Sequence, residues 1–173
     1  MKSRFITTAL LIATTILALA GCKKPVAEPE TAAPTIEWAA NPDFAPVEIA
    51  ENMNIDIVIK AEAGIQSFVV SVDSHAISPI IKLFTTDGSA SMDLINDTKL
   101  TGMFTAFGIG LPSGSELKDR TEVVFSLSTL VPMIADLSGQ RDHDTNHIFT
   151  LDMTDNENRT LSKSLTFHYS YVE

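Results

Sequence analysis

Alternating apolar and polar positions predict β-strands at the start of the chain's second quarter. Residues 54–60 carry isoleucine at every second position, with Asp56 and Lys60 on the opposite face, the two-residue period of a half-buried strand. After a break at Ala63–Gly64, residues 67–72 alternate again. Because only a short break separates the two runs, we predict that they form an antiparallel pair.

Three more alternating runs follow nearer the C-terminus. Residues 122–127 and 147–153 each place apolar side chains on one face, and residues 161–171 do the same with leucine, phenylalanine and tyrosine. The segment Asp155–Asn158 separates the last two runs and consists of turn-forming side chains. This pattern predicts a long terminal hairpin.

Helical spacing occurs in two places. Residues 97–107 predict a helix capped by Asp97, and residues 130–137 predict a second, short helix capped by Ser128 or Thr129. The apolar faces are Leu100, Met103, Phe104 and Phe107 in the first helix, and Leu130, Ile134 and Leu137 in the second. Several strands without a regular strand–helix alternation favour a mainly β, antiparallel sandwich with short helical insertions.

The N-terminal segment has the order of a secretory signal. Lys2 and Arg4 precede the uncharged run Phe5–Ala20, and small residues lead to Cys22. The run is shorter than the ~20 apolar residues of a membrane-spanning helix. We therefore predict a signal peptide over residues 1–21 rather than a transmembrane helix.

The four residues around the predicted cleavage site carry a sharper signal. Leu19, Ala20, Gly21 and Cys22 resemble the lipobox of bacterial lipoproteins. The resemblance implies that Cys22 receives a diacylglycerol, that cleavage precedes it, and that the new amino group is acylated. Several acyl chains give firm attachment, whereas one chain alone gives marginal binding. The alternative is an ordinary signal peptide with a chance cysteine.

The position after Cys22 bears on the membrane to which the protein is sorted. It holds Lys23, whereas an aspartate there favours inner-membrane retention in enteric lipoproteins. The resemblance therefore implies attachment to the cell outer membrane, without indicating the periplasmic or the surface face. Residues 22–35, with three prolines, predict an extended tether, and residues 36–173 the folded domain.

Composition narrows the classes of partner. The chain has 12 Lys and Arg against 22 Asp and Glu, a net charge of −10. Loss of residues 1–21 removes Lys2 and Arg4 and no acid, which gives −12. Acidity of this size argues against nucleic-acid binding, and a single cysteine excludes an internal disulfide or a Cys-rich zinc site.

A second resemblance concerns the predicted domain. It is carried by Trp38–Phe44, Ile55–Ala61, Gly64–Val70, Met92–Asn96, Leu130–Ile134, Phe149–Asp155 and Leu165–Phe167. These segments are similar to the N-terminal module of Bacteroidetes outer-membrane lipoproteins, some of which bear a carbohydrate-metabolism domain. The resemblance implies an immunoglobulin-like or fibronectin-like sandwich in the cell envelope, with no defined functional residues. Those lipoproteins commonly continue into another domain, whereas this sequence ends at Glu173.

Metal sites were sought among the histidines and acids. His143 and His147 stand four residues apart beside Asp142 and Asp144, a spacing that suits a metal on a helix. Here the spacing spans a loop and a strand, so a polar turn is the simpler interpretation. The segment Asp152–Asn158 has oxygen ligands but not the spacing of an EF-hand, and we interpret it as a hairpin turn.

No catalytic or cofactor motif emerges. Ser113 lacks the glycine-flanked nucleophile elbow, and Gly108–Gly114 lacks both the strand before it and the Lys-Ser/Thr pair of a phosphate loop. Trp38 could stack on a sugar, although at the entry to a strand it more often packs against the core. The same interpretation applies to Tyr169 and Tyr171. We therefore expect that the protein binds no cofactor and has no enzymatic activity.

These observations lead to one favoured function and two alternatives. The favoured one is a membrane-anchored, non-enzymatic interaction or spacer module whose partners are envelope proteins or glycans, with an accessory role in glycan capture. The first alternative is a small ligand-binding or hydrolytic lipoprotein with a pocket under residues 74–120, because long insertions often carry function. The second is an assembly subunit with an exposed sheet edge or a donor strand.

Overall fold

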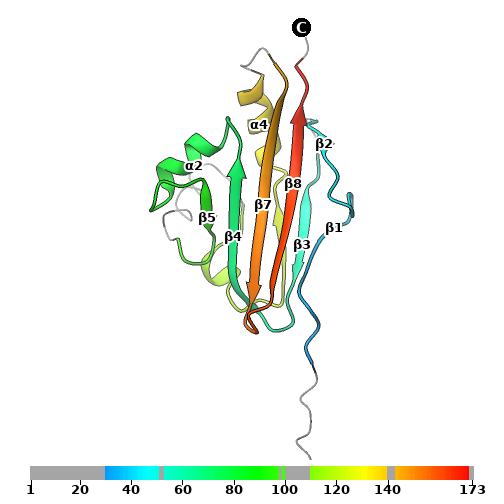
Figure 1. Cartoon of the computed structure of the whole chain (residues 1–173), viewed down its shortest axis with the longest axis vertical. Helices are drawn as coiled ribbons and strands as arrows, with labels where there is room; N and C mark the ends of the chain where they lie inside the picture. The colour runs from blue at the N-terminus through cyan, green and yellow to red at the C-terminus, as the bar shows by residue number, and fades with distance from the viewer. Residues whose placement is uncertain (1–29, 51–52, 98, 100–109, 140–142, 172–173) are drawn as a thin grey trace, which may run out of the picture. The chain divides into compact units, whose positions relative to one another are not determined.

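A computed structural model describes residues 30–50, 53–97, 99, 110–139 and 143–171 (Figure 1). A compact unit begins at Thr31. The predicted anchor residues Leu19, Ala20, Gly21 and Cys22 lie outside the described residues. Within the described part of the chain, no helix is long and apolar enough to cross a membrane.

The described strands form two sheets, so the expectation of a mainly β fold is confirmed. The three-stranded sheet has the order β1 (Thr35–Trp38), β3 (Asp56–Lys60) and β6 (Glu122–Ser126). The five-stranded sheet has the order β2 (Val47–Glu48), β8 (Thr160–Tyr169), β7 (Thr145–Asp155), β4 (Ile65–Asp73) and β5 (Ser91–Asp93). Among these strands, only β2 and β8 pair in parallel. The long β7–β8 hairpin is the predicted one (Figure 1).

The core lies between the inward faces of the two sheets, where the predicted alternations meet. Ile57 of β3 is fully buried, as are Phe68 of β4 and Phe125 of β6. The Phe68 and Phe125 rings, one from each sheet, contact edge to face at 5.3 Å between centroids, a favoured aromatic geometry. Period two therefore identified most of the side chains that are inside, but the prediction that Tyr171 packs on the same face is wrong, since it is exposed beyond the end of β8.

The predicted pairing of the first two long strands is wrong. Strand β3 pairs with β1 and β6, whereas β4 pairs with β5 and β7. Gly64, between them, has φ +86°, a conformation that suits glycine, and its amide donates to Ala61 O at 2.8 Å. This turn carries the chain from one sheet to the other, so the strands face each other across the core.

The helices follow the expectations in part. Helix α4 (Leu130–Ser138) lies where a short helix was predicted, and Pro132 falls in its first turn, where proline is tolerated. The predicted side-chain cap is wrong: Thr129 makes no capping bond, and the Ser128 hydroxyl accepts from the Ile55 amide at 2.9 Å. Hydrogen bonding at the end of the β3–β6 ladder competed with the local cap.

Two further helical segments lie in the long insertion. Helix α2 (Ser78–Phe84) has a proline in its first turn, and η2 (Gly114–Glu116) is a single 3₁₀ turn. Of the helix predicted over 97–107, the described Asp97 carboxylate accepts from the Lys99 amide at 3.1 Å. Its predicted apolar face, Leu100, Met103, Phe104 and Phe107, lies outside the described residues.

Candidate functional site

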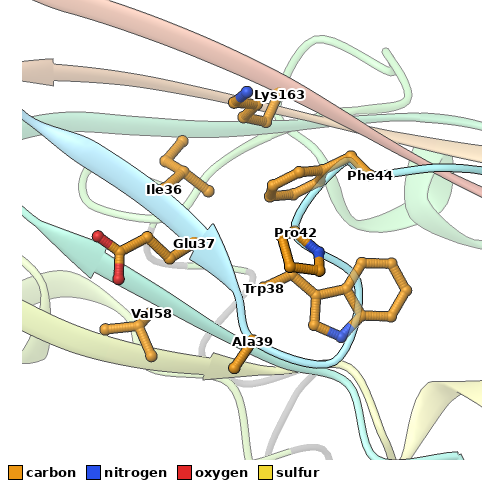
Figure 2. Close-up of a pocket in the computed structure, with 8 residues that line it drawn as sticks. All are labelled: Ile36, Glu37, Trp38, Ala39, Pro42, Phe44, Val58 and Lys163. Carbon is orange, nitrogen blue, oxygen red and sulfur yellow. The ribbon is translucent and has the colours of Figure 1, made fainter.

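A pocket of about 290 Å³ opens between β1 and β8, and we call it the β1–β8 pocket (Figure 2). Strand β1 contributes Ile36, Glu37 and Trp38, the loop after it Ala39, Pro42 and Phe44, and β3 and β8 contribute Val58 and Lys163. The loop is there because the chain leaves β1 in one sheet and becomes β2 at the edge of the other. Figure 2 shows Glu37 and Val58 across the pocket from Pro42, Phe44 and Trp38.

The aromatic wall of the pocket is held by the loop backbone. The Trp38 and Phe44 rings meet edge to face at 6.2 Å, and Trp38 is 3% exposed. Phe44 has φ +54°, a left-handed conformation that costs a non-glycine residue about 1–2 kcal/mol. Asn41 secures it: its side chain donates to Ala45 O at 2.7 Å and accepts from the Ala45 amide at 3.2 Å. Strain of this kind is common where a loop holds a ligand.

Two charged side chains border the pocket. The Lys163 ammonium lies 5.1 Å from the Phe44 ring centroid, a cation–π geometry. On the other side, Thr35 Oγ1 donates to Glu37 at 2.9 Å, and Lys60 Nζ donates at 3.2 Å. These hydrogen bonds, that of Thr35 first, and the charge of Lys60 lower the pKa of Glu37. Glu37 is therefore an ionised carboxylate that already has a cationic partner.

A second polar arrangement holds the point where the chain enters the fold, and we call Thr31, Asp155, Glu157 and Arg159 the entry clamp. Arg159 donates to Asp155 Oδ2 at 2.7 Å, to Thr31 O at 2.8 Å and to Thr31 Oγ1 at 3.0 Å. The Thr31 hydroxyl donates to Glu157 at 2.8 Å. The clamp thus fastens residue 31 to the turn between β7 and β8.

The buried carboxylate of the clamp is stabilised as an anion. Asp155 is 0% exposed, and burial alone would raise its pKa. Hydrogen bonds from the Arg159 amide and guanidinium and from the Glu157 amide, with the charge of Arg159, outweigh burial and lower the pKa of Asp155. These bonds close the turn at Asp155–Asn158, so the hairpin interpretation of this segment is confirmed.

A buried polar cluster surrounds His147, and we call it the His147 cluster. The Ser74 hydroxyl lies 2.6 Å from His147 Nδ1, and Ser138 Oγ and Thr145 Oγ1 lie 2.9 and 3.1 Å from Nε2. Ser74 Oγ already accepts from the Ala76 amide at 3.2 Å and from the Ile77 amide at 3.1 Å, so both its lone pairs are used and its proton goes to Nδ1. Burial first, then the charges of His75 and His168, lower the pKa of His147 to about 4.

The structure gives His143 and His147, the two histidines weighed as metal ligands, different environments. His147 is 0% exposed and bonded on both ring nitrogens, whereas His143 is exposed. In the described ranges, no three His, Cys, Asp or Glu side chains are grouped as a metal would require. The period-two run that places His147 with Phe149 and Leu151 was the signal that it is a core residue.

The remaining candidates have structural roles. Ser113 and Glu116 form a capping box at η2, and Gly110–Ser113 is a loop; Gly108 lies outside the described residues. Trp38 packs in the core, as predicted, against Phe167 at 6.3 Å between centroids. The β1–β8 pocket was not predicted, since its residues come from three distant segments.

Comparison with known proteins adds no relative. No known protein-family model matches the sequence, and no curated protein matches it.

Proposed function

We propose that this chain is a lipid-anchored protein of the cell outer membrane whose folded part is a non-enzymatic interaction or spacer module. The lipobox-like sequence Leu19–Cys22 supports the anchor. The entry clamp is the observation that carries the module: it holds Thr31 at the turn between β7 and β8. Thr31 is the ninth residue after Cys22, a reach of at most ~32 Å.

This reach is comparable to the length of the domain. Strand β7 has 11 residues, which correspond to about 34–37 Å. A domain held by its β7–β8 turn therefore presents its opposite end, with the start of β7, away from the bilayer. Such geometry suits a spacer or a module that meets partners beyond the membrane surface.

We propose further that the sandwich is of the immunoglobulin type. Support comes from strand order: the sheets β1-β3-β6 and β8-β7-β4-β5 correspond to A-B-E and G-F-C-C′ of that fold. The first strand also divides between the two sheets, with β2 parallel to β8 at the edge. The position of the conserved inter-sheet disulfide holds no cysteine, and the core there is apolar.

Membrane attachment is tested by mass spectrometry and by detergent-phase partition. The intact protein is expected in the detergent phase, with a tri- or diacylated N-terminal peptide beginning at Cys22. Cys22→Ala should yield no acylated peptide, and any Cys22→Ala protein whose signal is cleaved elsewhere should move to the aqueous phase. Lys23→Ala serves as the matched control and should stay acylated. An unmodified Cys22 in the purified protein would overturn the anchor.

The interaction role needs a separate test. Chemical crosslinking in intact envelopes followed by purification is expected to recover a specific envelope protein, or a glycan array to retain the domain. Recovery of neither partner would leave the spacer role, which a shortened tether would then test through loss of surface accessibility.

A further inference from the structure

The β1–β8 pocket combines an apolar wall with a cation that lacks a carboxylate partner. None of the ion pairs in the described part of the chain includes Lys163. Its ammonium instead lies over the Phe44 ring. The acid across the pocket, Glu37, is already paired with Lys60. One positive charge is therefore available to a ligand, on a chain whose net charge is −10.

The size and lining of the pocket limit the ligand. At about 290 Å³ the pocket lies at the lower end of the roughly 300–1,000 Å³ of small-molecule sites, which suits a small ligand of roughly ten non-hydrogen atoms. Ile36, Trp38 and Phe44 offer the apolar contacts. Binding pockets of this kind take an apolar group and fix its direction with a few polar side chains.

We propose that the β1–β8 pocket binds a small organic anion, a carboxylate attached to a ring or branched apolar group, with the carboxylate on Lys163 and the apolar group against Trp38 and Phe44. The charge on Lys163 selects the anion, because a charge-assisted hydrogen bond is roughly twice as strong as a neutral one. The strained φ of Phe44, held by Asn41, keeps the ring in place before the ligand arrives. A preformed wall reduces the ordering that binding requires.

Trp38 provides the assay because it is the only tryptophan of the chain. Phenylacetate is titrated into the purified protein with excitation at 295 nm, where the ligand does not absorb, and 2-phenylethanol serves as the neutral analogue. We expect a saturable change in Trp38 emission with a dissociation constant of roughly 0.1–5 mM for the anion, as suits ten atoms in an open site. The alcohol should bind at least about fivefold more weakly.

Two lysine variants separate recognition from general charge. Lys163→Met keeps the length of the side chain and should remove the anion's advantage while leaving the alcohol unchanged. Lys82→Met removes an exposed lysine on α2 and should leave both affinities as they are. Phe44→Ala, checked for folding by circular dichroism, should weaken both ligands.

Three results would overturn the proposal. They are no saturable change with either ligand, an anion preference that persists in Lys163→Met, and equal losses in the two lysine variants. The lysine variants keep the test valid even if Phe44→Ala does not fold. The assay does not depend on acylation of Cys22, so it stands or falls separately from the membrane anchor.

Discussion

Acid should destabilise the fold through His147, whose ring lies in a cluster that favours the neutral form. All three side chains bonded to its nitrogens are hydroxyl groups, so none brings a negative charge to an imidazolium. If Nδ1 were protonated, its proton would face the hydroxyl proton of Ser74, and the hydrogen bond between the two side chains would be lost. The ring is 0% exposed, and water cannot replace the missing partner without opening the cluster.

The size of the effect follows from the difference between two pKa values. The pKa of His147 is about 4 in the folded protein and ~6.5 in an unfolded chain. Between these values the unfolded chain binds the proton and the folded one does not, so the free energy of unfolding falls as pH falls. At 1.36 kcal/mol per pKa unit, the loss between pH 7 and pH 4 is about 3 kcal/mol. Below pH 4 this contribution levels off.

Urea unfolding at a series of pH values, followed by Trp38 emission, measures the loss. The midpoint should fall by about 1.5 M urea between pH 7 and pH 4, for a slope of about 2 kcal/mol per molar. His147→Gln should be less stable at pH 7 but should lose most of the dependence between pH 6.5 and pH 4.5, above the titration of most carboxylates. His143→Gln, at an exposed histidine, should keep the parent's dependence. A parent midpoint that stays constant from pH 7 to pH 4.5, or equal slopes in parent and His147→Gln, would refute the reasoning.

Two further predictions concern the turns at the entry end of the domain. Arg159→Met should lower the free energy of unfolding, measured by urea titration, by about 2–3 kcal/mol. This is less than the roughly 3–5 kcal/mol lost when a fully buried ion pair is broken, because two backbone amides still bond Asp155. The control Lys60→Met removes an exposed ion pair and should lower the free energy of unfolding by under about 1 kcal/mol. Gly64→Ala should cost more than about 2 kcal/mol, because φ is +86° and the added Cβ would lie 3.2 Å from the Asp119 carbonyl oxygen and 2.8 Å from the Asn156 side-chain nitrogen. That nitrogen is held by Ala63 O and Asp119 Oδ1, so it cannot easily move away. Gly88→Ala, with φ +70° in open space, should cost only about 1 kcal/mol of backbone strain, and thermal unfolding that ranks the two glycines equally would contradict the contact argument.

The sequence predicted which face of each strand is buried better than it predicted which strands pair with each other. The isoleucines of β3 and the phenylalanines of β7 and β8 are inside because period two is a local property of each strand. The pairing of strands depends on which edge of each sheet is free to accept another strand, and the local sequence gives no sign of that. Nearest strands along a chain are usually neighbours, yet the turn at Gly64 changes sheets. The glycine at this turn did not predict the change of sheet, since glycine occurs in turns of many kinds and its positive φ is known only from the structure.

The β1–β8 pocket and the His147 cluster could not be predicted from the sequence for a different reason. The β1–β8 pocket joins Glu37, Phe44 and Lys163, and the His147 cluster joins Ser74, Ser138 and His147. No spacing along the chain relates such positions, because the topology of the sheets brings them together. What the sequence did show was residue type and face: Trp38 was predicted to pack, and His147 stood in an apolar alternation.

The entry clamp also decides where mechanical force would enter the domain. Tension on the chain ahead of Thr31 reaches Arg159 and Asp155 before it reaches β1, a strand of four residues. It is passed to the β7–β8 hairpin, whose ladder has ten paired positions from Thr145–Tyr169 to Thr154–Thr160. A pull that would peel β1 from β3 is thereby diverted to the longest ladder in the described part of the fold. A load on the chain ahead of Thr31 should therefore break the entry clamp before β1 separates from β3.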